Sequence, residues 1–119
     1  MKEKELKPAV DQFLQWMQNL GLLMYRRLNS GVAFVGVPPD KLRKIKLCEP
    51  GTFDFEVNLR GTTVFIETKG TRGKLSDDQI AFFEKCLKHG CVPFVVETLE
   101  QVQKYLGEIE PKIKEVKVE

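Results

Sequence analysis

Two carboxylates and one ammonium in this sequence are spaced for chemistry, those of Asp54, Glu67 and Lys69. Residues 53–68 alternate apolar and polar side chains about a turn at 60–61, a pattern that predicts a β-hairpin. With that turn, Asp54 lies directly opposite Glu67, and Lys69 projects from the same face. Opposed carboxylates at the end of a hairpin need a cation, and Mg²⁺ or Mn²⁺ prefers such oxygen ligands. The pattern therefore predicts a metal site or, as the alternative, a partly solvated salt-bridge cluster.

Helices are expected wherever apolar residues recur at three- and four-residue spacing. The first such segment spans residues 4–20, and a second runs from Ser76 to about His89. A last helix opens at Thr98 and is expected to end before Gly107. These three helices leave the middle of the chain for strands.

The strands are shorter and less regular. Apolar stretches over 22–28, 32–37 and 42–47 are separated by turn residues and are interpreted as short strands or extended loops. The first of them is ambiguous between helix and strand. Residues 92–96 form a further short apolar strand. The order helix, strands, helix, strand, helix predicts an α/β fold with one mixed central sheet flanked by helices.

Size and composition restrict the class of protein. With 119 residues, 42% hydrophobic residues and a net charge of +2, the chain has the composition of a soluble globular protein and lacks the charge of a polycationic tail. We expect a single domain over residues 1–119, in which 107–119 are a tail or an edge strand. No apolar run approaches the ~20 residues of a membrane span, and the N-terminus lacks an apolar signal core. We therefore expect no membrane partner and a cytoplasmic location.

Two other sites suggested by local spacing are not supported by the rest of the sequence. Cys86, His89 and Cys91 are close in sequence, but structural zinc takes four ligands and only the distant Cys48 could complete the set. A packed helix face beside a turn is the better interpretation. The segment GTRGK (70–74) suggests a phosphate loop, but it lacks that motif's first glycine and its serine or threonine. We therefore expect no nucleotide cofactor.

Several short segments resemble one nuclease family. GTFD (51–54) and ETKG (67–70), joined by a strand, a turn and a strand, are similar to the motif of the PD-(D/E)XK nuclease superfamily. Three further segments resemble its VRR-NUC branch, the virus-type replication-repair nucleases: ELKPAVDQFL (5–14), RLNSG (27–31) and GKLSDDQ (73–79). The resemblance spans almost the whole chain, from Glu5 to Gly107, and implies a restriction-endonuclease-like αβββαβ core.

The resemblance also implies roles for the residues at the end of the hairpin. Asp54, Glu67 and the main-chain carbonyl of Thr68 would bind Mg²⁺ or Mn²⁺, and Lys69 would be the motif lysine. A divalent ion lowers the pKa of a bound water that attacks a phosphodiester, and a lysine can orient that water and offset developing negative charge. Glu5 would be a further metal ligand, although its charged run, MKEKELK, equally indicates a solvated helix face.

Gln79 has two interpretations. It matches the helix glutamine that, in the family, supports the lysine and the metal-bound waters. It also completes a capping box with Ser76, the same pattern that Thr98 and Gln101 form where no chemistry is implied. The sequence leaves both interpretations open.

A further set of residues would contact DNA. The resemblance implies this role for the first three, and the basic residues could form a positive rim for phosphates or simply a solvated surface. These residues are Arg27, Asn29, Ser30, Lys44, Lys46, Arg72 and Lys74.

These expectations combine into one functional prediction. The chain is expected to be a divalent-metal-dependent DNA endonuclease that hydrolyses phosphodiester bonds, selective for branched DNA in the manner of a Holliday-junction resolvase and working as a homodimer. The alternative is a catalytically weak nucleic-acid-binding module that keeps the nuclease fold.

Overall fold

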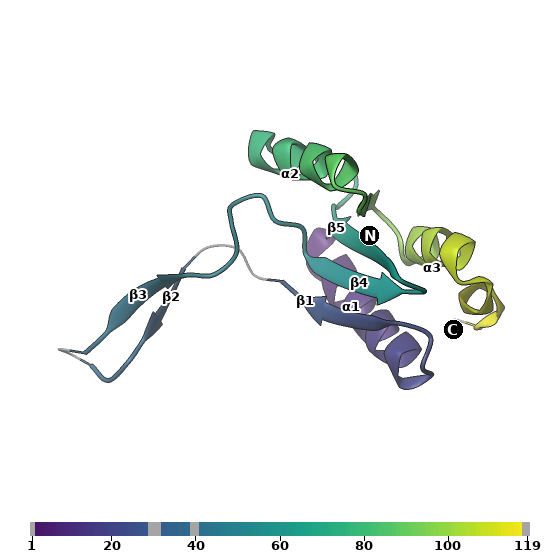
Figure 1. The fold of residues 1–119 in the computed structure, drawn as a ribbon, viewed down its shortest axis with the longest axis horizontal. Helices are drawn as coiled ribbons and strands as arrows, with labels where there is room; N and C mark the ends of the chain where they lie inside the picture. Colours follow the sequence, from purple (N-terminus) through teal and green to yellow (C-terminus); the bar gives the residue numbers. More distant parts are fainter. Residues whose placement is uncertain (1, 29–31, 39–40, 118–119) are drawn as a thin grey trace.

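The structure is a computed structural model that describes residues 2–28, 32–38 and 41–117 (Figure 1). Its elements, in chain order, are α1 (Glu3–Asn19), β1 (Met24–Arg27), β2 (Val32–Val35), β3 (Arg43–Lys46), β4 (Phe55–Leu59), β5 (Thr62–Thr68), α2 (Asp77–Lys88), β6 (Val92–Val96), α3 (Leu99–Ile109) and the 3₁₀ helix η1 (Pro111–Glu115). The three expected helices are confirmed, and so is the strand over 92–96. The ambiguous segment 22–28 contains a strand, β1.

A four-stranded mixed sheet with the order β1-β4-β5-β6 forms the centre of the fold. β1, β4 and β5 are antiparallel neighbours, and β6 runs parallel to β5. The expected hairpin register is confirmed, because Leu59 pairs with Thr62 and Phe55 with Ile66. Arg60 and Gly61 both have positive φ, as the tight two-residue turn between β4 and β5 requires.

Helices cover both faces of this sheet. Five residues of α1 at helical spacing are buried, and they pack with residues of α3 against the face that carries Phe55, Val57 and Ile66. The opposite face carries Phe65, whose ring lies 5.1 Å from that of Phe82 in α2. The mixed α/β architecture is therefore a three-layer one, with α1 and α3 on one side of the sheet and α2 on the other.

β2 and β3 do not belong to the central sheet. They pair with each other as a separate two-stranded antiparallel sheet, so the expectation of one mixed sheet is wrong for residues 32–47. Figure 1 shows this ribbon projecting from the body along the molecule's longest axis, which measures 53 Å against 30 Å for the other two. The alternation of strand residues is a local pattern and does not specify which strand is the partner.

The C-terminal segment also differs from expectation. Gly107 is a buried residue inside α3 and does not follow it. A Cβ atom at this position would lie 2.3 Å from Cγ of Lys114, so the missing side chain lets η1 pack closely against α3. Ile113 of η1 is fully buried in the core. Residues 107–117 are thus neither a tail nor an edge strand.

Two smaller expectations concern cysteines and membranes. Cys48, Cys86 and Cys91 are all free thiols, and Cys86 is buried on α2 as its helical position indicated. Burial raises the pKa of the Cys86 thiol to about 11. Within the described ranges, the helices are too short or too polar to cross a bilayer.

Candidate active site

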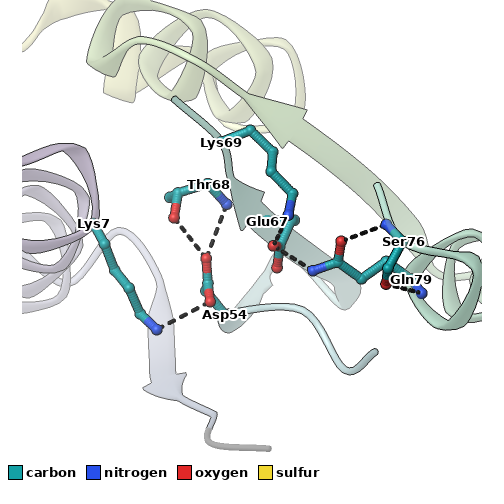
Figure 2. Close-up of polar contacts among 7 residues, drawn as sticks. All are labelled: Lys7, Asp54, Glu67, Thr68, Lys69, Ser76 and Gln79. Carbon is teal, nitrogen blue, oxygen red and sulfur yellow. Dashed lines mark hydrogen bonds and ion pairs between the residues drawn. The ribbon is translucent and has the colours of Figure 1, made fainter. Parts of the chain in front are cut away.

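The end of the β4–β5 hairpin brings the expected residues together. Asp54 immediately precedes β4, and Glu67 and Thr68 are the last residues of β5, so the last ladder pair, Phe55 with Ile66, places both carboxylates just beyond it. Figure 2 shows that α1 and α2 also direct side chains to this point. The site is therefore built by one hairpin and one helix from each side of the sheet.

Asp54 is held by three donors. Its Oδ2 accepts hydrogen bonds from the backbone N–H of Thr68 at 2.9 Å and from the Thr68 hydroxyl at 2.6 Å. Its Oδ1 lies 3.0 Å from Nζ of Lys7, which reaches across from α1 (Figure 2). In addition, the Asp54 carbonyl accepts from the N–H of Leu28 at 2.8 Å. This carboxylate is thus oriented by its neighbours and neutralised by an ammonium.

Glu67 is the most deeply buried charged residue of the site, with 3% of its surface exposed. Its Oε2 accepts a 2.7 Å hydrogen bond from Nε2 of Gln79 and lies 3.4 Å from Nζ of Lys69. Its Oε1 is buried and has no hydrogen-bond partner within the described part of the chain. An unpartnered carboxylate oxygen in the interior is costly, so this atom marks a position where a ligand would be stabilised.

The surroundings of Glu67 shift its ionisation. Burial and the nearby negative charge of Asp54 raise the pKa of this carboxyl to about 7, while Lys69 and Gln79 oppose the rise. A carboxyl with such a pKa is half-protonated near neutral pH. Strongly perturbed carboxyls of this kind cluster at functional sites, because a bound cation or a reacting group supplies the missing stabilisation.

Gln79 makes both contacts that the sequence left as alternatives. It is the third residue of α2, where its Oε1 accepts from the Ser76 N–H at 3.0 Å and completes a capping box. The same amide uses its Nε2 to bond Glu67. Gln101 forms the equivalent capping box at the start of α3, but among the described residues its side chain bonds only the backbone N–H groups of Glu97 and Thr98. The two capping boxes have the same local sequence pattern, and tertiary packing gives Gln79 a second role, which is to hold the Glu67 carboxylate.

The donor set is compatible with a divalent cation. Within the described residues no group of three His, Cys, Asp or Glu side chains is placed to hold a metal. The side chains that would bind a cation at this point are those of Asp54 and Glu67. Two carboxylates and several retained waters are a common arrangement for Mg²⁺. The buried, unpartnered Oε1 of Glu67 fits such an ion. Thr68 contacts Asp54 through its N–H and hydroxyl, and its carbonyl oxygen remains a predicted ligand.

Lys7 is the site residue that the sequence reasoning missed. It belongs to the charged run MKEKELK, for which the sequence leaves a solvated helix face as one of two interpretations. In the structure the Lys7 side chain is 29% exposed and lies against Asp54. One signal could have revealed it: Lys7 lies between Leu6 and Val10, two fully buried residues of α1. A position at the border of the buried face can direct a long side chain toward the end of the sheet.

Glu5 does not join the cluster. It is exposed on α1, and the contact that this helix makes with Asp54 comes from Lys7. Its metal-binding role remains a prediction that the geometry does not favour.

Arg27 lies near the site but is engaged elsewhere. It ends β1, opposite Phe55, and its guanidinium lies 3.8 Å from Asp11 of α1. Asp11 also accepts a 2.7 Å hydrogen bond from the Tyr25 hydroxyl. The pKa of Tyr25 is raised to about 12, mainly by burial and to a lesser extent by this hydrogen bond and the negative charge of Asp11. With half of its side chain exposed, Arg27 retains donors that can face a ligand.

The other expected DNA-binding residues lie in two places. Lys44 is exposed on β3, and Lys46 ends that strand, both on the projecting ribbon. Arg72 and Lys74 are exposed in the loop between β5 and α2, directly after Lys69. Asn29 and Ser30 lie outside the described residues.

No protein-family model matches the sequence, and a search of curated proteins finds no significant match.

Proposed function

We propose that this protein is a Mg²⁺- or Mn²⁺-dependent DNA endonuclease with a restriction-endonuclease-like core, selective for branched DNA and active as a homodimer. The observation that carries the proposal is the buried carboxylate of Glu67, which has one oxygen bound by Gln79 and Lys69 and the other without a hydrogen-bond partner among the residues that the structure describes. With the β2–β3 ribbon set aside, the element order α-β-β-β-α-β also agrees with such a core.

The proposed chemistry assigns a task to each residue. A divalent ion bound by Asp54 and Glu67 would lower the pKa of a water and stabilise charge on the phosphate oxygens. Lys69, whose side chain is only 15% exposed, would orient the attacking water and offset the negative charge that develops on the phosphate. Gln79 holds Glu67 in one orientation. Thr68 does the same for Asp54 through its N–H and hydroxyl.

The experiment that tests this function is cleavage of a labelled four-way junction, beside matched duplex, flap and single-stranded DNA, in Mg²⁺ and in Mn²⁺. Asp54→Ala, Glu67→Ala and Lys69→Ala are expected to abolish cleavage while circular dichroism shows that the fold persists. Lys88→Ala, an exposed residue at the end of α2, is the matched control and should cleave like wild type.

The outcomes separate the parts of the proposal. Paired nicks in the junction alone, absent from the three variants, support a resolving dimer. Cutting of other substrates keeps the chemistry and removes the junction selectivity. Metal binding without cleavage of any substrate would instead favour the nucleic-acid-binding module. Cleavage at the wild-type rate by a folded Lys69→Ala protein would remove that residue from the mechanism.

A further inference from the structure

The β2–β3 ribbon forms a two-stranded sheet separate from the central sheet. A two-stranded hairpin on its own is marginally stable in water, because it buries little surface. Here it extends away from the body (Figure 1), and several of its large apolar side chains are exposed. Phe34 is 65% exposed, and Val35 and Leu42 are 37% and 45% exposed. We call residues 32–38 and 41–47 the β-arm; its exposed surface needs a partner.

Charge restricts the class of that partner. The segment 32–47 contains four basic residues, Lys41, Arg43, Lys44 and Lys46, against the single acidic residue Asp40. The rest of the chain has slightly more acidic than basic residues. The positive charge of the protein is thus concentrated on the β-arm, which is the distribution expected for a surface that contacts phosphates.

The register shows how apolar and basic side chains are distributed over the ribbon. Phe34 pairs with Lys44 and therefore shares one face with it, while Val35 pairs with Arg43 on the other face. Each face thus carries an apolar side chain beside a cation. Two packed copies of the β-arm would bring cations of the two copies close together, whereas the core of a protein–protein interface is depleted of charge. A nucleic-acid groove offers the opposite environment, with phosphates along both walls and apolar sugar and base edges between them.

The base of the β-arm lies at the candidate active site. The N–H of Leu28, before the arm, donates to the carbonyl of Asp54, after it, at 2.8 Å. Gly51, on the returning segment, lies against the first turn of α2: a Cβ there would come within 2.4 Å of the Asp78 backbone. A ligand bound along the β-arm would therefore extend from the end of the sheet that carries Asp54 and Glu67.

We infer that the β-arm inserts into a groove of duplex DNA, with Arg43 and Lys44 on the phosphates of the walls and Phe34 against the sugars or base edges. The major groove, about 12 Å wide, accommodates a two-stranded β-ribbon. The choice of DNA as the ligand rests on the proposed nuclease function. In this arrangement the β-arm holds the duplex whose phosphodiester bond is presented to the carboxylates of Asp54 and Glu67.

The test measures binding separately from cleavage. Fluorescence anisotropy of a labelled 20-base-pair duplex is recorded in EDTA over a range of salt concentrations, with Arg43→Ala, Lys44→Ala and Phe34→Ala. Each basic-residue variant should weaken binding about 5- to 10-fold near 0.1 M salt and reduce the slope of log K against log salt by about 0.9. Phe34→Ala should weaken binding about tenfold and leave that slope unchanged. Lys104→Ala is the control, because this exposed residue lies on α3, at the opposite end of the molecule (Figure 1).

The outcomes distinguish this inference from the nuclease proposal. Arm-dependent binding by a protein that cuts nothing would support the arm and overturn the nuclease. Cleavage of DNA by a protein whose arm variants bind with wild-type affinity and slope would overturn the arm alone. The alternative partner of the β-arm is a second copy of the chain, and sedimentation of the same variants tests it. If Phe34→Ala turns a dimer into a monomer, while Arg43→Ala and Lys44→Ala leave the salt slope of DNA binding unchanged, the β-arm is a subunit contact. The inference is then wrong.

Discussion

The side-chain amide of Gln79 joins the N-terminus of α2 to the carboxylate of Glu67. Its Oε1 accepts from the Ser76 N–H at 3.0 Å, and its Nε2 donates to Glu67 Oε2 at 2.7 Å. The helix start and the buried carboxylate are therefore positioned by one residue. Gln101 is the equivalent capping residue of α3, and it makes no such bond to a carboxylate in the described part of the chain. Comparing the two residues therefore separates the effect of helix capping from that of the hydrogen bond to Glu67.

Gln101→Ala should lower the free energy of unfolding by about 1 kcal/mol, because it removes one half of a capping box. Gln79→Ala should lower it by about 2–3 kcal/mol, because it also removes a hydrogen bond to a buried carboxylate. Only Gln79→Ala also removes the donor to Glu67, so it alone should slow metal-dependent cleavage, by about tenfold for a hydrogen bond to a charged group. Urea melts and cleavage rates of both variants check this prediction. Equal cleavage by the two folded variants would show that Gln79 acts only as a cap.

The raised pKa of Glu67 predicts a pH dependence of stability. Its native pKa of about 7 exceeds its ordinary value of 4.5, so the folded protein binds the proton more tightly than the unfolded chain does. The destabilisation from ionised Glu67 is thus complete above pH 7 and absent below pH 4.5. Relative to Glu67→Gln, the metal-free wild type should gain about 3 kcal/mol between pH 8 and pH 4.5.

Urea melts of both proteins in EDTA at intervals from pH 4.5 to pH 8 measure this difference, because the contributions of titrating groups distant from Glu67 cancel between them. Added Mg²⁺ should stabilise the wild type at pH 8 and leave Glu67→Gln much less affected. A difference between the two proteins that does not change with pH would contradict the raised pKa.

Lys7 is expected to compete with a metal ion for Asp54. Its ammonium lies 3.0 Å from Asp54 Oδ1, and partly exposed ion pairs of this kind contribute up to about 1 kcal/mol. Lys7→Ala should therefore tighten Mn²⁺ binding by up to about fivefold, as measured by calorimetry. Lys4→Ala, an exposed residue of the same helix, should leave the affinity unchanged. Weaker Mn²⁺ binding by Lys7→Ala would mean that this lysine orients Asp54 for the metal and does not compete with it.

Gly51 is expected to be essential at the base of the β-arm. Gly51 and Gly21 both have positive φ, at 87° and 78°, but only Gly51 has backbone atoms of another segment where a Cβ would be. Gly21→Ala should cost about 1 kcal/mol from backbone strain alone. Gly51→Ala should cost about 1–3 kcal/mol more, because the loop must also move away from Asp78. Urea melts of both variants measure the two costs, and similar losses would show that the close approach to α2 is not maintained in solution.

The sequence alone determined the features that depend on neighbours in the chain. The alternation of residues 53–68 and the two-residue turn specify which β4 residue faces which β5 residue, and the observed register agrees. The positions of Asp54, Glu67 and Lys69 at one end of the hairpin follow from that register. The capping box of Ser76 and Gln79 is equally local, since it involves a single helical turn.

Which distant elements meet depends on how the whole chain packs. Lys7 reaches Asp54 because α1 packs across the sheet. The two residues are far apart in the sequence, so no local pattern predicts that they meet. Gln79 acquires its second partner because α2 covers the face that carries Glu67. β2 and β3 have the alternation of ordinary strands, yet they pair with each other outside the central sheet. The periodicity of a strand predicts which face of the sheet a side chain occupies. It does not predict the neighbouring strand, because strand pairing depends on the packing of the whole chain.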